Sequence, residues 1–201
     1  MLDPNIIYLN HGSYGACPKP IFKSLIKFQK ELEKARPDFA IIFSDTEFLY
    51  DPKFANRWIV KTLDGTKNFL HGIPHFAISI AYEERSELIA GMVYDPLRDE
   101  TFWALKGKGC YLNNRRLRVS ARRNLDSAIL ASNCPEQKIT PKPETLATQV
   151  MEMNLTASFR LSGAVALDLA YVAAGRYDVF WNLQSTPTDM AAGIVLVREA
   201  G

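Results

Sequence analysis

Long apolar runs, abundant cysteine and a strong net charge are all missing from this sequence of 201 residues. No window approaches the roughly 20 consecutive apolar residues that a membrane helix needs. The net charge of +2 gives no strong field that would attract nucleic acid or an acidic membrane surface. We therefore expect neither a nucleic-acid nor a membrane partner. The 47% of hydrophobic residues suits one globular domain, or one and part of a second.

The three cysteines, Cys17, Cys110 and Cys134, are odd in number and widely spaced. This pattern favours reduced thiols over a disulfide framework. The first residues contain no basic segment followed by an apolar core, so we expect no signal peptide. Together these features predict a cytoplasmic protein.

The pattern of apolar residues divides the chain into residues 1–50 and residues 51–201. In the first part, Ile6–Leu9 predicts a short strand. Apolar positions at helical spacing predict an amphipathic helix over Ile21–Lys34, which Pro37 ends. We expect this helix to need a partner surface.

Strand and helix patterns alternate in the second part, which indicates a layered fold of α-helices and β-strands. Asp64-Gly65-Thr66 predicts a turn into a helix, and Gly175 predicts the end of another helix. The expected strands are 58–60, 76–81, 88–94, 101–104, 110–112, 130–132 and 177–181, and the expected helices are 144–153, 165–174 and 189–197.

Two separated motifs give the resemblance to a known family. Residues 58–69 read Trp-Ile-Val-Lys-Thr-Leu-Asp-Gly-Thr-Lys-Asn-Phe, and residues 188–193 read Thr-Asp-Met-Ala-Ala-Gly. The first resembles the inositol monophosphatase signature, Trp-Ile-Val-Asp-Pro-hydrophobic-Asp-Gly-Thr-x-Asn-Phe, and the second resembles the family's Trp-Asp-x-Ala-x-Gly. Residues 71–76 and 106–109 continue the pattern, so the resemblance covers Arg57 to Gly201.

This resemblance implies an α+β fold, a layered αβαβα sandwich, incomplete here at both termini. It also implies a Mg²⁺-dependent phosphomonoesterase acting on inositol phosphate or a related sugar phosphate. Hard cations prefer oxygen ligands, and bound metals activate a water as nucleophile. Carried over, Asp64, the Leu63 carbonyl and Asp189 would bind metal. Gly65 and Thr66 would bind phosphate, with Asp64 and Thr66 as the catalytic residues.

The sequence departs from the family pattern at several positions. Lys61 stands where the family has the first aspartate, and Thr62 stands at its proline. Asn182 stands at the substrate-contacting acid, and Thr188 at the tryptophan of the second motif. No Gly-Glu-Glu segment precedes Trp58; the nearest candidate glutamate there, Glu47, has no supporting context.

Lys61 is the most damaging of these changes, because it places a positive charge beside a divalent cation. Two unit charges ~4 Å apart interact by about 4 kcal/mol at an effective dielectric constant near 20. We hypothesise that the Lys61 ammonium pairs with Asp64 or Asp189 and takes the place of one metal. Mg²⁺ would then bind weakly or not at all.

The first forty residues or so have a resemblance of their own. Residues 8–18, Tyr-Leu-Asn-His-Gly-Ser-Tyr-Gly-Ala-Cys-Pro, are similar to the opening of class V aminotransferases of the isopenicillin N epimerase-like group. No later segment resembles the surroundings of that family's pyridoxal-phosphate lysine, without which its chemistry cannot run. A pyridoxal-phosphate enzyme is therefore the least favoured interpretation.

Several other patterns have a plain interpretation that we favour. His71 and His75 could pair as metal ligands on a helix, but the Gly and Pro between them favour loop packing. Residues 106–109 lack the P-loop pattern and predict a hairpin turn. The arginines at 115, 116, 118, 122 and 123 could touch nucleic acid, yet no aromatic residues interleave with them, which favours a solvated face. Asp64 and Asp189 could each cap a helix.

Three functions remain open at this stage. One is a Mg²⁺-dependent phosphatase with a small phosphorylated substrate. The second is a catalytically inactive remnant, a pseudoenzyme or a binding protein, which Lys61 and Asn182 favour. The third is the pyridoxal-phosphate enzyme. The sequence does not decide whether the chain forms a homodimer.

Overall fold

The computed structural model describes the backbone of residues 6–8, 16–18 and 39–43, and the backbone and side chains of residues 56–133, 154–182 and 185–201. The predicted helices over 21–34 and 144–153 and the candidate glutamate at position 47 lie outside these residues. So do Cys134 and most of the aminotransferase-like segment.

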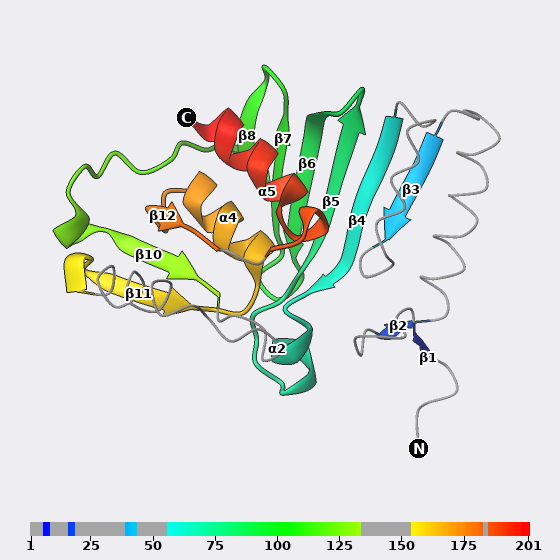
Figure 1. Cartoon of the computed structure of the whole chain (residues 1–201), viewed down its shortest axis with the longest axis horizontal. Helices are drawn as coiled ribbons and strands as arrows, with labels where there is room; N and C mark the ends of the chain where they lie inside the picture. Colours follow the sequence, from blue (N-terminus) through cyan, green and yellow to red (C-terminus); the bar gives the residue numbers. More distant parts are fainter. Residues whose placement is uncertain (1–5, 9–15, 19–38, 44–55, 134–153, 183–184) are drawn as a thin grey trace.

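A seven-stranded sheet forms the largest layer of the molecule (Figure 1). Its strands are in the order β3-β4-β5-β6-β7-β8-β9. The β3–β4 pair is parallel, and all the other pairs are antiparallel. The bounds are β3 (Phe39–Phe43), β4 (Asn56–Asp64), β5 (Ala77–Glu84), β6 (Glu87–Asp95), β7 (Glu100–Leu105), β8 (Gly109–Leu112) and β9 (Arg115–Arg116).

A second sheet of three parallel strands has the order β11-β10-β12, with β10 (Ile129–Ser132) in the centre between β11 (Ser158–Leu161) and β12 (Val179–Phe180). A short 3₁₀ turn, η1 (Leu125–Ser127), precedes β10. Apart from these sheets, β1 (Ile6–Tyr8) and β2 (Ala16–Pro18) form an antiparallel pair.

Helices α4 (Val165–Ala173) and α5 (Pro187–Ala200) form a layer between the two sheets (Figure 1). All nine residues of α4 are buried, which suits a helix covered on every side. The short helix α2 (Thr66–Leu70) follows β4 at one end of the large sheet. Sheet, helices and sheet are the three central layers of the predicted αβαβα sandwich.

The large sheet packs against α5 through residues that alternate along its strands, as expected for a sheet with one face on the core. The core includes Ala77, Val93 and Phe102, each 0% exposed. Gly91 permits the closest approach, because a Cβ atom there would lie 2.6 Å from the Ala192 carbonyl oxygen on α5. Small residues therefore set the spacing between sheet and helix.

Most of the predicted strands and helices in residues 57–201 are confirmed, with differences at their ends. The predicted strand 177–181 is only two residues long as β12, and β11 was not predicted at all. Helix α5 begins at Pro187, two residues before the predicted start at Asp189, because Thr186 caps it. Among the described residues, no helix is both long and apolar enough to cross a membrane.

Candidate active site

A β-bulge at the end of β4 brings Lys61 and Asp64 to the same side of the sheet. Lys61 pairs with Ser79 and Asp64 with Ala77, so three steps along β4 face two along β5. In a regular strand, side chains three positions apart point to opposite faces. The extra residue reverses this, as bulges near functional sites commonly do. As a result, the Lys61 Nζ and Asp64 Oδ1 atoms are 4.0 Å apart.

The turn into α2 follows directly. Gly65 has a φ angle of +80°, and a Cβ atom there would lie 2.8 Å from the His75 carbonyl oxygen, so only glycine fits without strain. Thr66 begins α2, and its Oγ1 donates a hydrogen bond to the Leu63 carbonyl at 3.2 Å. Thr66, which the resemblance assigns to phosphate binding and catalysis, is therefore in direct contact with the Leu63 carbonyl, which it assigns to metal binding.

Asp189 comes from the first turn of α5, 125 positions after Asp64. Its Oδ2 accepts a hydrogen bond from the Thr186 amide at 2.9 Å, which completes a capping box. Its Oδ1 forms an ion pair with the Lys61 ammonium. Asp189 thus caps the helix, as one interpretation of the sequence predicted, and it also faces the end of β4. The predicted pairing of Lys61 is also present, with Asp189 as the close partner.

The charges in this cluster are shielded from water. The side chains of Lys61, Asp189 and Asp64 are 15%, 12% and 5% exposed. Burial raises the pKa of Asp64 to about 6, against the opposing effects of the Lys61 charge and the Ala166 amide. That amide donates to Asp64 Oδ2 at 2.7 Å.

The described residues do not fit a Mg²⁺ site as they stand. Mg²⁺ needs near-octahedral oxygen ligands. Here both oxygens of Asp189 are engaged, and an ammonium group lies against the two carboxylates where a cation would bind. No group of three or more His, Cys, Asp or Glu residues within the described ranges could hold a metal ion.

Sequence reasoning assigned no role to three polar residues behind the cluster, Asn68, Ser162 and Asp168, although Asn68 belongs to the first family motif. Asn68 is buried and its amide donates to the carbonyls of His75 and Ser162. The Ser162 hydroxyl donates to Asp168 Oδ1 at 2.6 Å. Burial raises the pKa of Asp168, which is 0% exposed, to about 7. One sequence signal was available, because Asp168 is the only charged residue in the apolar helix α4.

Two of the other altered family positions lie at the start of α5: Asn182 precedes the helix, and Thr188 is in its first turn. Asn182 follows β12, and its amide donates to Ser185 Oγ at 2.8 Å. The Thr188 side chain is buried, and its hydroxyl lies 2.8 Å from that of Thr186. Thr188 therefore packs beside the helix cap.

The histidines at 71 and 75 take different places. His71 is the exposed C-cap of α2. His75 packs edge-on against Tyr171, with ring centroids 6.1 Å apart, and burial lowers its pKa. This geometry agrees with the loop-packing interpretation.

Residues 106–109 form the predicted hairpin turn between β7 and β8. The Gly107 and Gly109 amides donate to the Glu199 carboxylate at 2.8 and 2.9 Å. The chain's own acid therefore occupies the two amides that a phosphate loop would offer.

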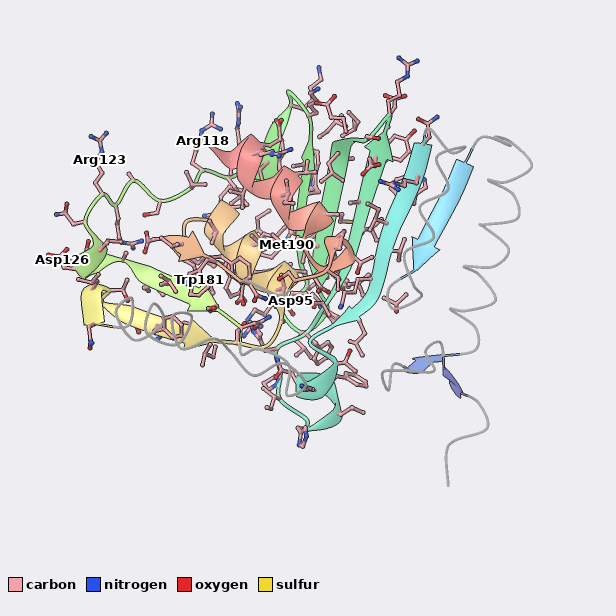
Figure 2. All side chains as sticks on the ribbon, viewed as in Figure 1. Asp95, Arg118, Arg123, Asp126, Trp181 and Met190 are labelled. Atoms are coloured by element: carbon pink, nitrogen blue, oxygen red, sulfur yellow. The ribbon has the colours of Figure 1, made fainter. Side chains whose placement is uncertain are left out.

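The arginines after β8 are exposed, and Arg118 and Arg123 project outward from the extended segment that leads to η1 (Figure 2). Arg122 pairs with Asp178 at 2.9 Å. The solvated-face interpretation fits this arrangement. Cys110 is a free, buried thiol whose pKa is raised to about 11 by burial.

Known proteins share both the sequence and the fold. The model of the inositol monophosphatase family matches residues 28–201. The inositol-1-monophosphatase of Rhizobium meliloti is 45% identical over 173 residues, which cover 86% of this chain and 65% of that protein. The Nus factor SuhB of Pseudomonas aeruginosa is 44% identical over 174 residues, or 85% of this chain and 64% of that protein. The chain thus spans slightly less than two thirds of the length of these relatives.

Solved structures agree. The extragenic suppressor protein suhB of Bartonella henselae matches with a TM-score of 0.81 and 42% identity, covering 98% of this chain and 76% of that one. The inositol monophosphatase of Anabaena matches with a TM-score of 0.80 and 31% identity, covering 90% and 71%. The α+β sandwich predicted from the motifs is confirmed, and the family match begins at residue 28 rather than at Arg57. This chain belongs to the inositol monophosphatase family.

Proposed function

We propose that this chain carries the site of a Mg²⁺-dependent phosphomonoesterase for inositol phosphate or a related sugar phosphate, with turnover strongly reduced or abolished by Lys61. One observation carries the proposal. The Lys61 ammonium is paired with Asp189 and lies 4.0 Å from Asp64. These are the two carboxylates that the family motifs assign to metal binding.

Electrostatics explains the expected size of the effect. A carboxylate at position 61 would attract a cation bound beside Asp64, whereas the ammonium repels it. At a separation of about 4 Å, each of these terms is about 4 kcal/mol for unit charges at a dielectric constant near 20. Because each 1.4 kcal/mol changes a binding constant about tenfold, Mg²⁺ affinity falls by orders of magnitude.

Relatives support the substrate class by their names. The Rhizobium and Anabaena proteins are called inositol monophosphatases. A fold neighbour with 22% identity was solved with Mg²⁺ and phosphate, and another neighbour, with 26% identity, with inositol monophosphate. In this chain Gly65 and Thr66 retain the residue types of the phosphate-binding turn.

The test compares phosphate release from inositol 1-phosphate and a panel of sugar phosphates, with Mg²⁺ and with a chelator. We expect little or no release from wild type and Mg²⁺-dependent release from Lys61→Asp, increased at least about tenfold. Adding Asp64→Asn to that variant should abolish it. Lys67→Asp, which makes the same charge change on the exposed face of α2, is the matched control and should behave as wild type.

Two results would contradict the proposal. Full Mg²⁺-dependent turnover by wild type would show that Lys61 does not impair the site. A folded Lys61→Asp variant that neither binds Mg²⁺ nor releases phosphate would show that Lys61 is not what limits the site.

A second function, binding of a partner without catalysis, is favoured by the names of several relatives. Proteins called Nus factor SuhB from Pseudomonas aeruginosa, Haemophilus influenzae and Escherichia coli are 39–44% identical to this chain. If this chain acts only by binding, the Asp64→Asn variant should complement a strain in which the gene is deleted as fully as the wild-type protein does. Failure of that variant alone would favour the phosphatase.

A further inference from the structure

Asn68 links three segments that are far apart in the sequence. It lies in α2 and is 8% exposed. Its Nδ2 donates to the His75 carbonyl at 2.7 Å and to the Ser162 carbonyl at 2.8 Å. The amide group has two N–H donors, so both are used. Asn68 therefore ties α2 to the loop before β5 and to the loop before α4.

The loop before α4 is held from its other side by Asp168. The Ser162 hydroxyl donates to Asp168 Oδ1 at 2.6 Å and accepts from the Ala164 amide at 3.4 Å. Asp168 is 0% exposed, and its Oδ2 has no hydrogen-bond partner. Burying a carboxylate with one unpaired oxygen lowers the free energy of unfolding. The presence of Asp168 in α4 therefore suggests that it has a structural or functional role.

The start of α4 in turn orients Asp64. The Ala166 amide, in the first turn of α4, donates to Asp64 Oδ2 at 2.7 Å. Two close contacts limit any shift of this helix end. A Cβ atom at Gly65 would lie 3.2 Å from the Ala164 Cβ, and one at Gly163 would lie 3.3 Å from the Asn68 amide.

We infer that Asn68, acting through Ser162 and Asp168, is the positioning residue for Asp64. It fixes the first turn of α4 so that the Ala166 amide holds one carboxylate oxygen. The other oxygen, Oδ1, is left facing Lys61 and Asp189. The orientation of Asp64 is therefore set from the side of α2 and α4, away from the ion pair between Lys61 and Asp189. The inference deepens the proposed function, on which its consequence for cation binding rests.

The first test reads the Ala166–Asp64 hydrogen bond directly and needs no metal. In ¹⁵N NMR spectra we expect Asn68→Ala to shift the Ala166 amide resonance in the same direction as Asp64→Ala does. In the same variant, the hydrogen-exchange rate of the Ala166 amide should be at least tenfold higher than that of the Ala170 amide in the middle of α4. Asn56→Ala removes an equally buried asparagine at the far end of β4 and controls for a general loss of stability.

The inference is overturned if Asn68→Ala folds and its Ala166 amide keeps the chemical shift and the exchange rate of wild type. If Asn68→Ala does not fold, Ser162→Ala answers the same question, because it removes the bonds to Asp168 and Ala164 but leaves the Ser162 carbonyl. An unchanged Ala166 amide in folded Ser162→Ala would equally overturn it.

The second test uses the Lys61→Asp background and measures Mg²⁺ binding by calorimetry. We expect Asn68→Ala to weaken Mg²⁺ binding about tenfold or more, and Asn56→Ala to leave it within twofold. Equal Mg²⁺ affinity with and without Asn68 would refute the positioning role. If Lys61→Asp itself binds no Mg²⁺, the proposed function fails, and the NMR result alone decides the inference.

Discussion

Replacing Lys61 with methionine removes the ammonium and keeps most of the side-chain volume. Asp64 and Asp189 then face each other without a positive charge between them. The three side chains are only 5–15% exposed, so water screens the interaction weakly. Removing one partner from a buried ion pair costs roughly 3–5 kcal/mol. Because the pair retains some exposure, we expect Lys61→Met to lower the free energy of unfolding by about 3 kcal/mol.

The assay is urea unfolding in metal-free buffer, with Lys67→Met on the exposed face of α2 as the matched control. A double-mutant cycle with Asp189→Asn isolates the pair, and we expect a coupling of about 2 kcal/mol, within the usual range for residues in contact. Mg²⁺ should stabilise Lys61→Met more than wild type, since the repulsion is gone. The reasoning is refuted if Lys61→Met unfolds within about 0.5 kcal/mol of wild type, the scatter of ordinary surface substitutions.

Two further predictions concern Asp64 and the contact between sheet and helix. The folded-state pKa of Asp64 is about 6, above its ordinary value of 3.8, so its contribution is present at low pH and is lost as the pH rises through 6. In urea titrations, wild type should therefore lose about 2 kcal/mol relative to Asp64→Asn between pH 4 and pH 7; a pH-independent difference would contradict this. Gly91→Ala places a Cβ 2.6 Å from the Ala192 carbonyl oxygen, so it should lower stability by about 1–3 kcal/mol, and an unchanged thermal midpoint would show that α5 moves away freely.

Local patterns were sufficient to predict most of the described fold. The apolar stretches 76–81 and 88–94 predict strands, which the structure extends to β5 and β6, and Gly175 ends α4 because it adopts a left-handed conformation. β11 was missed although Ser158–Leu161 alternates polar and apolar residues, and in the structure this alternation does not mark a buried face, because Phe159 is only half-buried and Leu161 is exposed. The start of α5 was misplaced because the Thr186 cap and Pro187 precede the apolar pattern.

The sequence by itself determined the family motifs, the charge reversal at Lys61 and the residue types of the phosphate-binding turn. Each of these depends on the identity of a residue, or on neighbours within a few positions. The family match from residue 28 to 201 shows that the resemblance was sound where the motifs carried it.

Only the tertiary structure decided which carboxylate Lys61 pairs with and what holds Asp64. Lys61 and Asp189 are 128 positions apart, and a regular strand would have pointed Lys61 and Asp64 to opposite faces. The bulge in β4 and the packing of α5 on the sheet bring them together. Asn68 belongs to the first motif and Asp168 is the only charged residue of α4. Their roles and that of Ser162 still could not be read from the sequence, because they lie in contacts between segments whose spacing in the sequence does not encode their distance in space.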